Sequence, residues 1–364
     1  MFELTNEQRK CFALPPVQDS WKRIEVKKGP YDTCNTYAYL DGQQIMKVVQ
    51  VYDVPGQEIY REYSVNQSIS TDGTKLLPKT TKGKPQNFIA SYLENKTPVG
   101  MAINFNRDYA SIINNDSEQC YYRSSYCGEK IESLGDFKSW VEDWCKNTGE
   151  KELKEIIEFS KRKRTHQKYK EGDFFRFKIN RSLYGYGRIL LNFDKMRRDG
   201  IKFWEIFMGK PLCVAVYHVA TTNQNLKPND LIGKKMLPSH MIMDNIFYYG
   251  ECEIIGNLPI EENEINYPIH YGRSISLREP NTINYQCGKT FVSRKFKKEL
   301  GDFRNGGIGW DLTVKLPILL ECIKDDSNNP YWKMISPYSA NVDLRNPKFK
   351  DLLKQIKHQM GIKQ

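Results

Sequence analysis

The sequence predicts an α+β protein in which a mainly antiparallel β domain, a helical junction and a second, bent antiparallel sheet or partial barrel follow one another along the chain. Segments that alternate polar with β-branched or aromatic residues dominate residues 21–105 and 173–280, and Gly- and Asp-containing turns separate them. Between these regions the apolar residues recur with a helical period. A period of two is typical of strands with one buried face, and a period of 3.6 is typical of helices.

Length and composition support two or three folded domains. The chain has 364 residues, of which 39% are hydrophobic and 12% aromatic, which argues against general disorder. The longest apolar stretch, residues 212–220, has the length of a strand and is too short to span a membrane. The first ten residues, MFELTNEQRK, are polar and carry no signal-peptide pattern, so we expect a cytoplasmic protein.

The nine cysteines are scattered along the chain and form no C-x-x-C pair. This distribution predicts neither a disulfide framework nor a zinc site, and we expect no cofactor. Cys213 and Cys252 lie in apolar, strand-like segments, where a free cysteine behaves as a small core residue.

Residues 1–130 are predicted to form the first, mainly β domain, to which we can assign no function. Residues 36–51 alternate like two strands around Asp41 and Gly42, and Asp-Gly suits a tight hairpin because both residues tolerate positive φ angles. A basic loop follows at residues 79–85. A Gly-Lys loop can hold phosphate, but this one lacks the spacing of a P-loop.

Residues 131–167 are predicted to form the helical junction. Ser133 and Asp136 are candidate caps. The apolar stripe of this helix consists of Phe137, Trp140, Val141 and Trp144, which we expect in a core. A cluster of basic residues closes the junction, and its members include Arg162, Arg164 and Lys168. Cations suit the C-terminal end of a helix dipole, or they contact an acidic partner.

Residues 168–285 are predicted to form a second β domain, and residues 286–364 to form a C-terminal extension. Short aromatic strands separated by glycine-containing turns predict a small, strongly bent sheet. The extension ends in an amphipathic, basic segment, residues 346–361. We expect a C-terminal helix there, packed by Phe349, Leu352, Leu353 and Ile356.

A lysine-rich lead followed by a glycine-aromatic signature opens the second β domain. The lead enters Gly172 and Asp173, and the strand that follows reaches Tyr184-Gly-Tyr-Gly-Arg188. Together with IFYYGECEIIGNLPI at residues 246–260, this run resembles the immunity protein 26 family of bacterial polymorphic-toxin systems, over about residues 165–285. The resemblance implies an α+β fold and a role in neutralising a toxin by binding it.

The residues of the signature also carry physical expectations of their own. Asp173 can close the turn into the first strand by accepting backbone N–H bonds. Gly185 and Gly187 allow a bulge or a close approach between strands. Arg188 is either a salt-bridge partner inside the bent sheet or an exposed recognition group, since Tyr and Arg dominate protein interfaces.

The charge of the chain is uneven. Residues 1–150 hold 18 Lys and Arg against 20 Asp and Glu, a net charge of −2, whereas residues 151–364 hold 37 against 24, a net charge of +13. The basic part predicts an acidic partner, which is either a protein face or nucleic acid. A nucleic-acid-binding module therefore stays an alternative function.

Catalysis has little support in the sequence. Part of the immunity protein 26 family is labelled as phosphotriesterase-like, which implies a metal-dependent hydrolase. The five histidines (His166, His218, His240, His270 and His358) are widely spaced and show no metal-ligand pattern. A hydrolase is thus the weakest of the three interpretations.

We therefore predict a non-catalytic, intracellular immunity protein that neutralises a bacterial toxin by direct binding. The predicted partner is the toxin domain, and we expect no membrane partner. The predicted contact is an exposed face at Tyr184, Tyr186 and Arg188 on the signature strand, together with Arg162, Arg164 and Lys168 from the basic cluster.

Overall fold

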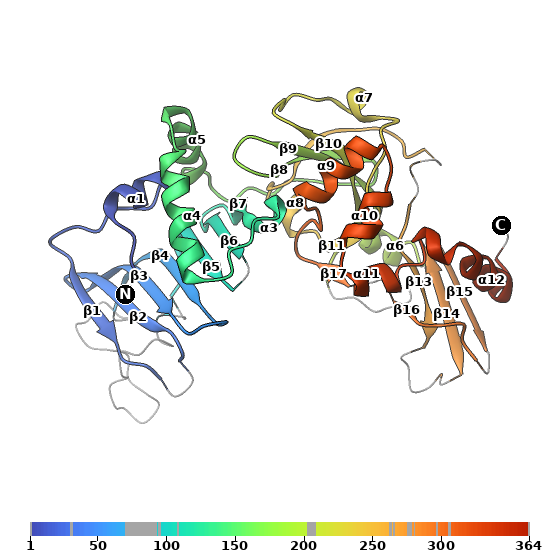
Figure 1. Ribbon diagram of the computed structural model, residues 1–364, viewed down its shortest axis with the longest axis horizontal. Coiled ribbons are helices and arrows are strands. Elements are labelled where there is room, and N and C mark those ends of the chain that lie inside the picture. Colours follow the sequence, from blue (N-terminus) through green and yellow to red (C-terminus); the bar gives the residue numbers. More distant parts are fainter. Residues whose placement is uncertain are drawn as a thin grey trace. The chain divides into compact units, whose positions relative to one another are not determined.

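The structure is a computed structural model that divides into two compact units, residues 1–165 and 166–364 (Figure 1). It describes residues 2–29, 32–69, 93, 96–107, 109–201, 209–261, 264, 266–274, 279, 281–295, 298–304 and 307–362. The basic loop at residues 79–85 lies outside the described residues. Both units combine helices with sheets whose strands are almost all antiparallel, which confirms the predicted α+β class.

The first unit is a seven-stranded antiparallel sheet in which each strand pairs with the next along the chain. Its elements are α1 (Asn6–Cys11), β1 (Lys22–Val26), β2 (Asn35–Asp41), β3 (Gln44–Tyr52), β4 (Ile59–Ser68), β5 (Val99–Asn106), β6 (Tyr109–Asn114), β7 (Gln119–Arg123), α3 (Ser124–Cys127), α4 (Leu134–Lys146) and α5 (Glu150–Ser160). The predicted hairpin is confirmed: β2 and β3 are joined at Gly42, whose φ of 57° is readily adopted by glycine.

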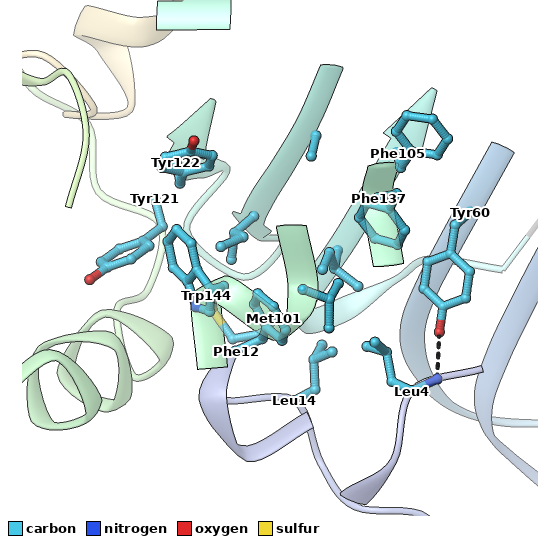
Figure 2. Packing of buried hydrophobic residues seen from close by; sticks show 14 of the residues in the cluster. Leu4, Phe12, Leu14, Tyr60, Met101, Phe105, Tyr121, Tyr122, Phe137 and Trp144 are labelled. Atoms are coloured by element: carbon cyan, nitrogen blue, oxygen red, sulfur yellow. Dashed lines mark hydrogen bonds between the residues drawn. The ribbon is translucent and has the colours of Figure 1, made fainter. Parts of the chain in front are cut away.

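Helix α4 packs its aromatic stripe on this sheet. Ser133 and Asp136 form a capping box at its start, as predicted. Phe137 is fully buried, with its ring 5.0 Å from Phe105 and 5.3 Å from Tyr60, measured between centroids. Figure 2 shows these rings in the same cluster as Trp144. Burial of several aromatic side chains, each of which contributes roughly 2–3 kcal/mol, fixes the helix on the sheet.

The helical junction ends earlier than predicted. Helix α5 stops at Ser160, and residues 162–170 are not helical. The buried side-chain amide of Asn114 donates to the carbonyls of Phe159 (2.9 Å), Ser160 (3.3 Å) and Arg162 (3.2 Å). Phe159 and Ser160 belong to the last turn of α5, where a helix leaves its carbonyls short of intrahelical donors, and the Asn114 amide from the sheet supplies a donor there. Helices α4 and α5 both belong to the core of the first unit.

A buried network of charges ties the N-terminal segment to the first sheet. The Glu62 carboxylate is fully buried and accepts from Arg9 Nε at 2.7 Å, from the Tyr60 hydroxyl at 2.7 Å and from Lys47 Nζ. Lys47 Nζ also donates to the Pro15 carbonyl at 2.7 Å. Burial acts to raise the pKa of Glu62, but the Lys47 and Arg9 cations outweigh it and hold that pKa below its usual value.

The second unit contains a six-stranded sheet in the order β12-β8-β9-β10-β11-β17 and a four-stranded sheet in the order β15-β14-β13-β16. Its strands are β8 (Asp173–Lys178), β9 (Tyr184–Asn192), β10 (Pro211–Thr221), β11 (His240–Met243), β12 (Glu253–Asn257), β13 (Ile269–Arg273), β14 (Thr282–Cys287), β15 (Thr290–Lys295), β16 (Phe303–Arg304) and β17 (Ile308–Gly309). Its helices are α6 (Phe193–Arg198), α7 (Pro228–Leu231), α8 (Asn245–Tyr248), α9 (Leu316–Asp325), α10 (Asn329–Met334), α11 (Pro337–Val342), the 3-10 helix η2 (Pro347–Phe349) and α12 (Lys350–Met360).

The predicted C-terminal helix is α12. It lies against the four-stranded sheet, where Ile356 and Met360 are fully buried and Leu352 and Leu353 are partly buried. The turn into β8 also agrees with the prediction, because the Asp173 carboxylate accepts from the Lys170 backbone N–H at 2.7 Å.

Cys213 and Cys252 are buried, as expected of small core residues, and all nine cysteines are free. In the part of the chain that the structure describes, no helix is both long and apolar enough to cross a membrane.

Candidate functional site

The arginine of the glycine-aromatic signature lies inside the second unit. Arg188 sits on β9, in the middle of the six-stranded sheet, and its side chain is fully buried. Its guanidinium pairs with the Glu264 carboxylate and donates to the carbonyls of Leu258 (2.7 Å) and Pro259 (2.5 Å). Its Cζ atom lies 4.3 Å from the centroid of the Phe174 ring. Arg188 thus fastens the segment after β12 to the face of the sheet.

Glu264 completes this buried pair. One carboxylate oxygen accepts from the Glu261 backbone N–H at 2.8 Å, and the other also receives the Tyr217 hydroxyl at 3.4 Å. Burial raises the pKa of Tyr217, so this hydroxyl stays protonated and donates. The expectation that Arg188 is an exposed recognition group is wrong, because a carboxylate from a distant segment compensates the guanidinium inside the fold.

The two tyrosines of the signature have different surroundings. Tyr186 is fully buried, and its hydroxyl donates to the Asn223 carbonyl at 2.6 Å. It was predicted to be exposed, but it belongs to a buried apolar cluster with Phe174, Tyr217 and Leu231. Tyr184 is half-buried, with Arg176 Cζ at 5.5 Å and Lys178 Nζ at 6.0 Å from the centroid of its ring. Of the three predicted contact residues on β9, Tyr184 is the one whose side chain reaches the surface.

The glycines of the signature permit close strand packing, as predicted. A Cβ atom at Gly187 would lie 2.5 Å from the Ala215 carbonyl oxygen and would also overlap the Phe175 ring. At Gly185 it would overlap the Phe177 ring. The register between β9 and β10 shifts at this point, which is the expected bulge.

The basic cluster pairs largely with the first unit. Arg162 donates to the Gln119 side chain at 3.1 Å, Arg164 pairs with Glu118, and Lys163 pairs with Asp116 at 2.6 Å. These side chains remain accessible to solvent, and the Arg164 side chain is 49% exposed. Lys168 is exposed and belongs to the second unit. The cluster is therefore an accessible basic segment that is partly neutralised by its own sheet.

A pocket in the second unit was not foreseen from the sequence. Its volume is about 470 Å³, and it forms where β11 and β17 meet α9, α10 and α11. Its lining residues are Ser239, His240, Met241, Pro268, Gly307, Ile308, Gly309, Thr313, Lys315, Ile318, Tyr331, Met334, Ile335, Ser336, Ser339, Asp343 and Arg345. The pocket joins segments more than 100 residues apart, so neither spacing nor periodicity could reveal it. The one local sign in the sequence is that Asp343 and Arg345, two lining residues of opposite charge, are only two positions apart.

Arg345 and Asp343 form an ion pair at this pocket. The guanidinium donates to the carboxylate from Nε at 3.0 Å and from the terminal nitrogen at 2.7 Å, and the side chains are 9% and 4% exposed. It also donates to the carbonyls of Ser239 (2.8 Å) and Asn266 (2.9 Å). Burial acts to lower the pKa of Arg345, but the Asp343 carboxylate outweighs it and raises that pKa. Each partner thus carries its charge, and the pair has no net charge.

Two histidines near this pair are held in the neutral form. Burial, reinforced by the Arg345 cation, lowers the pKa of His240 to about 3 and that of His270 to about 4. His240 Nε2 accepts from the Thr313 backbone N–H at 3.2 Å, which agrees with an unprotonated nitrogen. Within the described residues, no three His, Cys, Asp or Glu side chains lie close enough together to hold a metal ion.

Comparison with known proteins assigns the central segment of the chain. Residues 170–279, from β8 through β13, match the family model described as immunity protein 26. No curated protein and no solved structure matches the chain. The predicted resemblance is therefore confirmed for this segment, and it supports a toxin-neutralising immunity role in general. The first unit and the residues after 279 lie outside the match.

Proposed function

We propose that this chain, whose residues 170–279 match the immunity protein 26 family, neutralises a toxin domain by direct binding in the bacterial cytoplasm. The family match is the observation that carries the proposal. The nine free cysteines support a reducing compartment, because disulfides form in oxidising compartments.

The chemistry of the matched segment supports binding rather than catalysis. Its buried cation, Arg188, is compensated by Glu264 and backbone carbonyls. A histidine with a pKa of about 3 or 4 is a weak base at neutral pH, which makes His240 and His270 poor general bases. A protein that only binds its partner does not require a side chain with a pKa near 7, whereas general acid–base catalysis favours one.

Charge supports an acidic partner surface. Residues 166–364 hold 31 Lys and Arg against 21 Asp and Glu, so the second unit carries +10 of the net +11. A field of this sign accelerates association with an acidic protein. Of the predicted contact residues, Tyr184, Lys168, Arg162 and Arg164 have accessible side chains, and we propose these as contacts.

The test begins with affinity purification of the tagged chain from its host, with and without nuclease and in high salt. We expect one protein to co-elute under all conditions, because a well-packed interface depends less on salt than phosphate contacts do. That protein is then expressed in a heterologous bacterium with and without this chain. Growth arrest that this chain relieves supports the proposal, and arrest that it leaves unchanged contradicts it.

A nucleic-acid-binding module is the second candidate, and one observation favours it. Lys295, Lys298, Lys350 and Lys357 lie on β15, α12 and the segment after β15, and among the described residues no carboxylate pairs with them. Lysines without a carboxylate partner are available to contact a phosphate backbone. Co-elution of nucleic acid that disappears with nuclease or salt would favour this candidate over toxin binding.

A further inference from the structure

Large apolar side chains that are exposed to solvent lie on the segments that line the pocket. The exposed fractions are 66% for Trp310, 45% for Met334 and 77% for Tyr338. Met334 lines the pocket, Trp310 follows the lining residue Gly309, and Tyr338 precedes the lining residue Ser339. Trp, Tyr and Met are enriched in protein interfaces, where they surround and fill pockets.

This part of the second unit is unusually apolar for a surface. Ten large hydrophobic residues are exposed in the described part of the chain, and five of them lie within residues 310–338. The five are Trp310, Leu320, Ile323, Met334 and Tyr338. Single exposed hydrophobic residues are normal, but a local concentration of them marks an interaction surface.

The interior of the pocket suits an uncharged group. Arg345 and Asp343 neutralise each other, and the pKa of His240 lies far below neutrality. Much of the remaining wall is apolar and includes Met241, Pro268, Ile308, Ile318 and Ile335. Apart from the exposed Lys315, the lining offers a charged side chain no free counter-charge for the hydration it would lose, whereas an apolar side chain gains from leaving water.

The mouth of the pocket suits an acidic neighbour of that group. Lys315 lines the pocket, is exposed, and has no carboxylate partner among the described residues. The unit around it carries a net charge of +10. An Asp or Glu beside the buried group would therefore meet a cation at the rim, where water still hydrates both charges.

We propose that this pocket is an anchor site for a peptide segment of the partner protein. The anchor is one large uncharged side chain, aromatic or long aliphatic, flanked by Asp or Glu. At about 470 Å³ the pocket falls within the range of roughly 300–1,000 Å³ that is typical of ligand sites. The inference rests on the proposed function only in assigning the segment to the neutralised toxin.

The site joins the matched segment to the C-terminal extension. Ser239, His240 and Pro268 lie within residues 170–279, and the helices that close the pocket lie after residue 279. The extension therefore supplies the part of the site that the matched segment lacks.

The test is selection of random 12-residue peptides on phage with the full-length chain as bait. We expect enriched peptides to share an aromatic or long aliphatic residue next to Asp or Glu. The synthetic consensus peptide should lose at least about tenfold in affinity for Ser339→Trp, which fills the pocket, and for Met334→Asp. Lys315→Glu should weaken the binding of the peptide about fivefold. The controls Lys234→Glu and Tyr109→Ala change residues that do not line the pocket, and they should leave the affinity within twofold of the natural chain.

Thermal unfolding of each variant shows whether its fold is kept, and Met334→Asp tests the pocket if Ser339→Trp does not fold. The proposal is overturned if no consensus emerges, or if the consensus peptide binds a folded Met334→Asp or Ser339→Trp variant as well as the natural chain. Because no toxin is used, failure here leaves the growth-rescue result untouched, and failure of growth rescue leaves the peptide result untouched.

Discussion

Arg188 in β9 and Glu264 in the segment after β12 form an ion pair in which both side chains are almost completely removed from solvent. Removing two charges from water costs free energy of desolvation. Each partner therefore needs the other, because the loss of one leaves an uncompensated charge in the core. The strand that carries the family signature is thus held in place from within.

Replacing Arg188 by Met should destabilise the second unit by about 3–5 kcal/mol, because the change leaves the Glu264 carboxylate buried without its cation. Adding Glu264→Leu should recover most of the loss, since an apolar pair can replace a buried ion pair at little cost. Hydrogen exchange of a peptide covering residues 184–192 measures the effect locally. Arg198→Met is the control, because that side chain is 70% exposed. Unchanged exchange in Arg188→Met combined with loss of toxin binding would instead make Arg188 a contact residue.

Replacing Gly187 by Ala should destabilise the chain by roughly 3 kcal/mol, because the added methyl group meets the Ala215 carbonyl, which cannot move aside without breaking the β9–β10 pairing. Gly307→Ala is the matched control, since nothing lies within 4 Å of the position of its Cβ atom. Thermal unfolding of the two variants measures the difference. Equal melting temperatures would contradict the tight packing of this strand pair.

Local chemistry made much of the fold predictable. The Ser133–Asp136 capping box, the Asp41-Gly42 hairpin and the turn at Asp173 each depend on residues close together in the sequence. The glycines of β9 were predictable for the same reason, because a strand that lacks side chains at alternate positions can approach its neighbour closely.

Long-range pairing was not predictable. Nothing in the sequence joins Arg188 to Glu264, 76 positions later, or joins Asn114 to the carbonyls that end α5. An arginine that follows a glycine-aromatic run has the same sequence neighbourhood whether it is buried or exposed. The pocket beside Arg345 was missed on the same grounds, because segments distant in the chain build it.

Charge reversal of Lys168 and truncation of Tyr184 should each weaken the complex with the toxin about tenfold, since both side chains reach the surface of the second unit. The dissociation constant of the co-purified protein for Lys168→Glu and Tyr184→Ala measures this. Arg198→Glu, an exposed change on α6, should stay within twofold. If all three variants bind equally well, the contact lies elsewhere on the chain.

Glu62→Gln should destabilise the first unit by about 3–5 kcal/mol, because the neutral amide removes the buried carboxylate that both the Arg9 and the Lys47 cations contact. Urea unfolding at pH 7 measures the loss. Glu129→Gln provides a control at an exposed residue whose carboxylate accepts from the Tyr122 hydroxyl. A loss below about 1 kcal/mol would show that the network contributes little to the stability of the first unit.

The second unit should lose stability as the pH falls from 6.5 to 5. His270 is 3% exposed, and burial lowers its pKa from 6.5 to about 4. Because the unfolded chain binds a proton near pH 6.5 and the folded chain does not, the stabilisation is complete above pH 6.5 and is lost as the pH approaches 4. The loss between pH 6.5 and 5 amounts to roughly 1.5 kcal/mol for this one histidine.

Urea unfolding midpoints of the natural chain and of His270→Gln at pH 6.5, 5.7 and 5 measure this pH dependence. The variant should show a smaller decrease with falling pH, because glutamine does not titrate, even if its stability at pH 6.5 is lower. His358→Gln is the control, since that side chain is exposed on α12 and is hydrated in both states. An identical slope for the natural chain and His270→Gln would mean that His270 accepts a proton in the folded unit, and that its surroundings are more polar than the buried contacts of β13 indicate.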